Sequence, residues 1–257
     1  MPRLILYNIG YCMGMTGRWY EYLKFWRVLF PPREIEMRMI ENLKKTKPDI
    51  LGMIEVDIGS CRAKKRNMAK VFMKELKLKD HAKKIKYPKK GIMRLFHKIP
   101  ILKYQANAII SRQTLENVKY HELSVGAKRL VIEAVITTPK KLTLLLVHLA
   151  LKKKTRQKQL DEIKDLVNKQ KNPVILMGDF NTFDGKDELE LLLKNTDLLD
   201  PQKNIPKKNK CTFPCFNPKK RLDYILVSKG IKVNKYQVLD FQLSDHLPIL
   251  MDFEVKN

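Results

Sequence analysis

The stretch Pro173-Val-Ile-Leu-Met-Gly178-Asp179-Phe-Asn181-Thr is the most informative part of this 257-residue sequence. A short apolar run that ends at a glycine is typical of a buried β-strand. Here the run is followed at once by a carboxylate and an amide, Asp179 and Asn181. Strand ends and the loops after them are where a rigid sheet presents side chains for chemistry. The stretch therefore indicates a strand that carries functional groups at its C-terminal end.

The same arrangement recurs along the chain. Strand signals cover residues 4–8, 49–55, 106–111, 119–123, 129–137, 141–149, 222–228, 231–241 and 249–255, and helix signals cover 33–47, 62–78, 153–170 and 187–194. The polar residues at strand ends are Asn8, Glu55, Asn107, His148, Asp179, Asn181, Asp223, Asp245 and His246. A single polar residue at a strand end is common, because Asp and Asn often form turns. Nine polar residues at the ends of separate strands instead favour a shared functional site. The many strands and few helices predict two packed sheets covered by helices, in a single domain spanning residues 1–257.

The chain is strongly basic, with 52 Lys and Arg against 27 Asp and Glu and a net charge of +25. The charge is uneven, because residues 60–104 hold 16 basic and 2 acidic residues, and smaller basic clusters follow at 152–158 and 203–220. An extended polyanion, either nucleic acid or an anionic membrane surface, is the natural partner of such a field. The alternative is a solvated surface without a partner.

Other features narrow the class of protein. No apolar stretch approaches the ~20 residues of a membrane-spanning helix, and no secretory signal is visible. Four cysteines without a paired spacing indicate free thiols rather than a zinc site or a disulfide framework. We therefore expect a soluble, cytoplasmic, globular protein that is monomeric and has no obligate protein partner.

Two further segments stand out. The first is aromatic, and its members are Trp19, Tyr20, Tyr22, Phe25, Trp26 and Phe30. It is either a packed loop or a rim that wedges into nucleic acid or enters lipid. The second, Asp80–Lys103, is basic and contains two prolines. We expect it to be a mobile loop that faces the substrate.

The strand-end side chains suit the cleavage of a phosphodiester. Mg²⁺, with Mn²⁺ as a substitute, prefers carboxylate and carbonyl oxygens, which Glu55, Asn8 and Asp245 can supply. Asp179 can take the proton of the attacking water, while Asn181 orients that water or binds a phosphate oxygen.

The remaining polar residues complete this interpretation. His148 and His246, as imidazolium donors, can neutralise the transition state or protonate the leaving oxygen. Asp223 can hold His246 in one tautomer, as the third member of other catalytic triads does. Asn107 and Arg129 are candidate substrate contacts.

Seven segments in this order resemble the endonuclease/exonuclease/phosphatase superfamily, which includes pancreatic-type deoxyribonucleases, apurinic-site endonucleases, inositol-phosphate phosphatases and neutral sphingomyelinases. The segments are Leu-Tyr-Asn8-Ile, Gly-Met-Ile-Glu55-Val-Asp, Asn107-Ala-Ile-Ile-Ser, Val-His148-Leu, Met-Gly-Asp179-Phe-Asn181-Thr, Arg221-Leu-Asp223-Tyr-Ile-Leu and Ser244-Asp245-His246-Leu-Pro-Ile. The resemblance implies a four-layer α/β/β/α sandwich of the deoxyribonuclease type. It also implies hydrolysis of phosphoesters that depends on a divalent metal.

The resemblance also implies roles for the matching residues. Glu55 and Asn8 match the metal site, with Asp245 as a further metal-linked carboxylate. Asp179 matches the base or water-orienting position, Asn181 a phosphate contact, His246 the catalytic histidine and Asp223 its partner. His148 matches a histidine of the deoxyribonuclease and sphingomyelinase branches, where apurinic-site enzymes have a tyrosine.

Three functions from different classes remain open at this point. The spread of positive charge favours a nuclease that acts on DNA or RNA. The aromatic segment favours a phospholipase-C-like phosphodiesterase of the sphingomyelinase type at a membrane surface. A non-catalytic module that binds a polyanion is the third, and the complete set of site residues argues against it.

Overall fold

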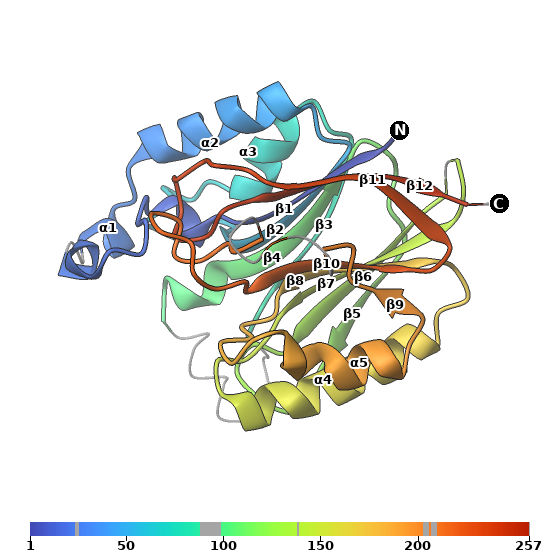
Figure 1. Cartoon of the computed structure of the whole chain (residues 1–257). Coiled ribbons are helices and arrows are strands. Elements are labelled where there is room, and N and C mark those ends of the chain that lie inside the picture. The colour runs from blue at the N-terminus through green and yellow to red at the C-terminus, as the bar shows by residue number, and fades with distance from the viewer. Residues whose placement is uncertain (24–25, 88–98, 138, 203–205, 207–209, 257) are drawn as a thin grey trace.

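The computed structural model of the chain describes residues 1–23, 26–87, 99–137, 139–202, 206 and 210–256 (Figure 1). Several features that the sequence singles out lie partly outside these residues. They are the middle of the basic stretch (88–98), Phe25 of the aromatic segment, and Lys203, Lys207 and Lys208 of the last basic cluster.

Two six-stranded sheets, built from the described residues, form the centre of the fold. The first sheet contains, in spatial order, β11 (Ile231–Val238), β12 (Ile249–Val255), β1 (Arg3–Asn8), β2 (Ile50–Asp57), β4 (Gln105–Ser111) and β3 (Asp80–Ile85). The second contains β5 (Glu116–Glu122), β6 (Leu130–Ile136), β7 (Leu142–His148), β8 (Val174–Asp179), β10 (Asp223–Ser228) and β9 (Leu198–Leu199). In each sheet one parallel pair, β1 with β2 and β7 with β8, lies among antiparallel neighbours.

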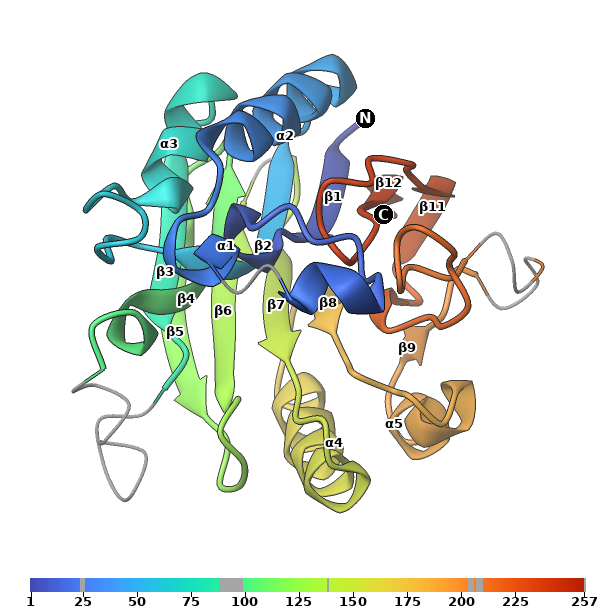
Figure 2. The same cartoon turned by 90° about the vertical axis from the view of Figure 1, so that its left-hand side faces the viewer.

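The helices lie on the outer faces of the two sheets, except for the first, which projects beyond one end of the sandwich (Figures 1 and 2). They are α1 (Trp26–Leu29), α2 (Arg33–Thr46), α3 (Met68–Glu75), α4 (Lys153–Asn168) and α5 (Glu190–Lys194), with 3₁₀ turns at Gly10–Cys12, Trp19–Leu23, Leu102–Tyr104 and Lys186–Leu189. Helices α2 and α3 cover the first sheet, and α4 and α5 cover the second. None of the helices in the described ranges has the length and apolar character that crossing a bilayer requires.

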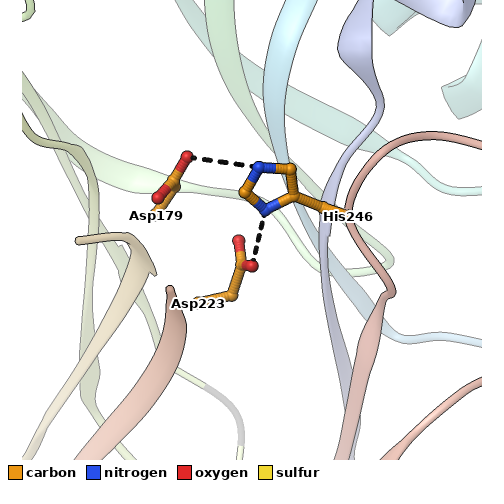
Figure 3. A group of neighbouring side chains, drawn as sticks. All are labelled: Asp179, Asp223 and His246. Carbon is orange, nitrogen blue, oxygen red and sulfur yellow. Dashed lines mark hydrogen bonds and ion pairs between the residues drawn. The ribbon is translucent and has the colours of Figure 1, made fainter. Parts of the chain in front are cut away.

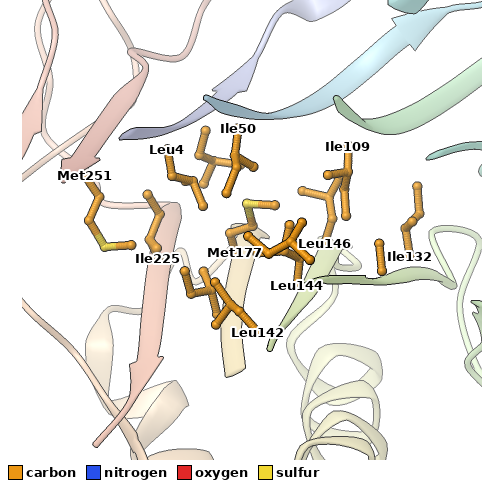
Figure 4. Close-up of a cluster of buried hydrophobic side chains, with 14 of the residues drawn as sticks. Leu4, Ile50, Ile109, Ile132, Leu142, Leu144, Leu146, Met177, Ile225 and Met251 are labelled. Carbon is orange, nitrogen blue, oxygen red and sulfur yellow. The ribbon is translucent and has the colours of Figure 1, made fainter. Parts of the chain in front are cut away.

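Three apolar layers hold the four layers of the sandwich together. Side chains such as Leu4, Ile109 and Met177 fill the space between the two sheets (Figure 4). A second cluster packs the first sheet against α2 and α3, and a third packs the second sheet against α4 and α5. Central strands are buried on both faces, which explains why their sequences are nearly continuous apolar runs rather than alternating ones. The predicted α/β/β/α sandwich is confirmed.

Two local predictions are wrong. The helix predicted over 62–78 begins only at Met68, because the Asn67 side chain caps it by accepting a hydrogen bond from the Lys70 amide. The segment predicted as a loop from Asp80 begins instead with strand β3, which pairs with β4 at the edge of the first sheet. Lysines suit an edge strand because they discourage pairing with another chain, and here they hide the strand signal.

Strand β7 ends at His148, and a buried ion pair fixes the loop that follows it. The Arg156 guanidinium contacts Glu188 at 2.5 Å and donates to the carbonyl oxygens of Ala150 and Leu151. Both charged side chains are almost completely buried. The loop after His148 is therefore tied to α4 and to the 3₁₀ turn before α5.

We expect Glu188→Ala to lower the free energy of unfolding by about 3–5 kcal/mol, because it leaves a buried guanidinium without its counter-charge. Glu190→Ala is the matched control, since Glu190 pairs with Lys194 at 2.7 Å on the surface. Exposed pairs contribute little to stability, so this change should leave the urea midpoint nearly unaltered. Urea unfolding of both variants checks the prediction, and equal midpoints for the two would contradict it.

Candidate active site

Strand register brings three of the predicted residues together at one edge of the second sheet. His148 ends β7 and lies directly opposite Asp179 at the end of β8. Asp223 begins β10 and lies opposite Asp179 on its other side. Gly178 makes this close pairing possible, because a Cβ at that position would lie 2.1 Å from the Val147 carbonyl oxygen. The sheet itself therefore aligns the three side chains.

A hydrogen bond joins this edge to the first sheet. The Asn8 amide, at the end of β1, donates from Nδ2 to Oδ2 of Asp179 at 3.2 Å. The same oxygen lies 3.4 Å from Nε2 of His148 and 3.9 Å from Nε2 of His246. Asp179 is thus the point at which residues from both sheets and from the loop before β12 meet.

His246 lies between two carboxylates (Figure 3). Its Nδ1 contacts Oδ2 of Asp223 at 2.7 Å, and the Thr212 hydroxyl donates to the same oxygen at 2.6 Å. Burial opposes the charge of the imidazolium, but Asp223 and Asp179 together raise the pKa of His246 to about 10. Burial, helped by the Asp223 charge, raises the pKa of Asp179 to about 6. At neutral pH a charged imidazolium therefore stands beside a carboxylate that can accept a proton.

Glu55 enters the site from a β-bulge in β2. The register between β2 and β4 shifts between Met53 and Val56, and Glu55 has a φ of 58°. Such bulges re-aim side chains next to functional sites. The Glu55 amide donates to Oδ1 of Asn107 at 3.4 Å, which links β4 to the bulge.

A second carboxylate, Asp245, lies close enough to Glu55 for the two charges to interact. Burial raises the pKa of Asp245, and the negative charge of Glu55 raises it further. The backbone of Asp245 is held by a hydrogen bond from the Cys215 amide to its carbonyl oxygen at 2.8 Å. Both carboxylates are half-buried, and two carboxylates that repel one another in this way are typical of a site for a cation.

Two lysines outside the predicted set of site residues complete the site. Lys86 is buried, lies 3.9 Å from Glu55 and donates to the Tyr11 hydroxyl. Burial lowers the pKa of Lys86 to about 8, against the attraction of Glu55. Lys128 is half-buried and contacts Nε2 of His148. The site therefore holds fixed positive charge as well as carboxylates.

The sequence predicts that His148 and His246 are both charged imidazolium donors, but the surroundings of His148 disfavour its charged form. Burial and the ammonium groups of Lys128 and Lys86 lower the pKa of His148 well below its ordinary value. His148 is therefore neutral at pH 7, and His246 is the charged histidine of the site. A neutral imidazole can still donate one hydrogen bond.

The structure also places the three predicted substrate contacts. Asn181 has a φ of 53°, a conformation that asparagine tolerates better than most residues. Its backbone amide donates to Asp179 at 3.0 Å, and its side chain donates to the Leu149 carbonyl at 2.9 Å. Nδ2 of Asn107 is buried and has no hydrogen-bond partner in the described part of the chain.

Arg129 is not brought to this cluster by any of its hydrogen bonds. Its guanidinium donates to the Glu122 carboxylate at 2.6 Å and to the Ser124 carbonyl at 3.2 Å. The neighbouring Lys128 contacts His148 instead. Of these two neighbouring basic side chains, it is therefore Lys128 that contacts a residue of the cluster.

The donor set fits a hard divalent cation. Ligand atoms of Asp179, Asp223 and His246 lie within 4.8 Å of one another. The raised pKa of His246, however, favours an imidazolium in the short contact with Asp223, and a charged imidazolium is not a metal ligand. The oxygen-rich side formed by Glu55, Asp245 and the Asn8 amide suits Mg²⁺ better, because Mg²⁺ prefers one or two carboxylates and keeps several waters.

Comparisons with known proteins concern the family and the fold of the chain. The model of the endonuclease/exonuclease/phosphatase family matches residues 35–246. No curated protein sequence matches the chain.

Many solved structures share the fold. An endonuclease/exonuclease/phosphatase from Beutenbergia cavernae is 16% identical with a TM-score of 0.76, and the match covers 100% of this chain and 72% of that one. An endonuclease/exonuclease/phosphatase family protein from Leptotrichia buccalis is 20% identical with a TM-score of 0.71, and the match covers 99% of this chain and 100% of that one. A mannosyl-6-phosphatase from Bacteroides thetaiotaomicron is 16% identical with a TM-score of 0.67, and the match covers 99% of this chain and 100% of that one. At these identities the likeness shows the fold alone.

Proposed function

The chain belongs to the endonuclease/exonuclease/phosphatase family, and from this premise we propose that it hydrolyses phosphodiesters with the help of a divalent metal. The observation that carries the proposal is the position of Asp179. Its Oδ2 lies within 4 Å of Asn8, His148 and His246. This oxygen can accept the proton of a water molecule that attacks phosphorus, because burial has raised the pKa of Asp179 toward neutrality.

The other side chains have complementary tasks. The imidazolium of His246, oriented by Asp223, stabilises negative charge or protonates the leaving oxygen. Asn107, Asn181 and Lys128 bind phosphate oxygens. A divalent ion held by Glu55, Asp245 and Asn8 would polarise the phosphoryl oxygen as a Lewis acid.

We propose nucleic acid, DNA or RNA, as the first candidate substrate. The net charge of +25 is distributed over several segments, which suits a long phosphate backbone. The second candidate is a phospholipid headgroup. The observation that favours it is the row of exposed apolar side chains between Trp19 and Phe30.

The test offers the purified full chain, with Mg²⁺ or Mn²⁺, four substrates in parallel: supercoiled plasmid, single-stranded DNA, RNA and short-chain sphingomyelin. Cleavage of a nucleic acid that Asp179→Asn abolishes supports the first candidate. Hydrolysis of sphingomyelin with intact nucleic acids overturns it in favour of the second. If the parent protein hydrolyses none of the four, the proposed activity is wrong.

We expect Glu55→Gln to weaken Mn²⁺ binding by about 10- to 100-fold, because the site loses one of its two ligand charges. Calorimetric titration with Mn²⁺ measures this without reference to activity. Glu75→Gln is the control, since Glu75 is an exposed acid that pairs with Lys44 at 2.7 Å. If both variants bind Mn²⁺ like the parent protein, Glu55 is not a metal ligand.

A further inference from the structure

We propose that the aromatic arm, defined here as residues 19–23 and 26–30, docks the protein on the surface of an anionic phospholipid bilayer. Figure 1 shows α1, which belongs to this arm, projecting beyond one end of the sandwich. Figure 2 looks onto that end, with α1 in front of the strands. The proposal concerns binding and does not depend on which phosphodiester is cleaved.

The arm gathers several exposed apolar side chains in one short stretch of the chain. Among the described residues, the exposed large apolar side chains of the arm are Trp19, Tyr20, Leu23, Trp26, Val28, Leu29 and Phe30. Trp19 and Phe30 are 78% and 73% exposed. Exposed apolar residues scattered singly are normal, whereas a contiguous group marks an interaction surface.

The base of the arm is fixed to the body of the protein. The buried carboxylate of Glu21 accepts hydrogen bonds from the Thr16 amide and hydroxyl and from the Arg18 amide. Arg27 donates to the Gly14 carbonyl at 3.0 Å. The arm is therefore held in place by polar contacts at its base, while its apolar side chains face outward.

The same base lies next to the candidate active site. The Phe216 amide donates to the Thr16 carbonyl, and the adjacent Cys215 amide donates to Asp245. A Cβ on Gly17 would lie 3.7 Å from Cβ of Asp245. A surface on which the arm rests would thus lie at the rim of the site.

Charge and composition together select the partner. Residues 18–33 include four basic residues and one acidic residue, Glu21. The carboxylate of Glu21 is buried and hydrogen-bonded, so the positive charges dominate the exposed surface of this segment. A second copy of a chain with a net charge of +25 would be repelled. Nucleic acid would use the aromatic rings for stacking but would leave Leu23, Val28 and Leu29 in water. A bilayer accepts aromatic and aliphatic side chains alike, and its anionic headgroups attract Arg18 and Arg33.

The sequence supplies a direct probe, because its two tryptophans, Trp19 and Trp26, both lie in the arm. Vesicles of phosphatidylcholine with 30% phosphatidylglycerol should shift the tryptophan emission of the full chain to shorter wavelength. Lipids brominated near the glycerol end of the acyl chain should then quench it. Pure phosphatidylcholine vesicles should bind more weakly, because they lack the anionic charge. Emission that neither vesicle alters would overturn the proposal.

Variants separate insertion from simple charge attraction. Trp19→Ser with Phe30→Ser should bind the anionic vesicles roughly 100-fold more weakly, since each large apolar side chain contributes about a factor of ten. Leu151→Ser with Leu191→Ser removes two equally exposed apolar residues elsewhere, 62% and 60% exposed, and should bind like the parent. Equal binding by both double variants would overturn the proposal, as would tryptophan emission that single-stranded DNA alters and vesicles do not. Asp179→Asn should keep full vesicle binding, so a failure of the proposed catalysis remains distinguishable.

Discussion

Replacing Asp179 with asparagine is expected to lower turnover by about 10²-fold or more, with the fold intact. The change keeps the shape of the side chain, but an amide cannot take a proton from water. Oδ2 of Asp179 is the oxygen that lies near both His148 and His246. The loss should therefore appear in kcat, measured on whichever phosphodiester the substrate panel identifies.

The matched control for this variant is Asp184→Asn. Asp184 follows Asp179 in the chain by a few residues, but its carboxylate is exposed and pairs with Lys153 at 3.2 Å. It should retain the activity of the parent protein. Thermal unfolding of both variants shows whether the fold is kept. Normal turnover by Asp179→Asn would mean that another group accepts the proton.

The strands and the residues at their ends could be predicted from the sequence for a physical reason. A strand buried on both faces must be a continuous apolar run, and a polar residue stands out when it ends such a run. Asp179, Asp223 and His148 could each be picked out in this way. Their pairing could not, because register between strands depends on contacts far apart in the chain. The structure shows all three at adjacent positions.

Lys86 escaped prediction because the chain contains so many lysines. In a sequence with 52 Lys and Arg, a buried lysine looks like an exposed one. Only the fold shows that Lys86 is enclosed beside Glu55 and Tyr11. The signal that could have found it is its place directly after a strand, but that strand, β3, was itself hidden among lysines.

The sequence pattern could identify Glu55 as a candidate, but it could not predict the direction of its side chain. The sequence places it near the end of an apolar strand, which makes it a candidate. The bulge and the positive φ that turn its side chain toward the site come from the pairing of β2 with β4. For Arg129 the fold gives a different result. Its place in a basic pair made it a candidate substrate contact, but its guanidinium donates to Glu122.

The second large effect is expected at the pair of His246 and Asp223. His246→Gln should lower kcat by about 10²- to 10⁴-fold, because the site loses the charged group that we propose acts on the leaving oxygen. Asp223→Asn should have an effect of the same order, since the carboxylate that contacts Nδ1 at 2.7 Å both orients the imidazole and helps to keep it protonated.

The double variant decides whether the two residues act as one unit. Residues that act together give losses that are far from additive. The double variant should therefore be no slower than the slower single variant by more than about threefold. Thr212→Val is a milder control, because it removes only the hydroxyl that donates to Asp223 at 2.6 Å. Losses that simply multiply in the double variant would show that Asp223 acts independently of His246, and the proposal that Asp223 orients His246 would be wrong.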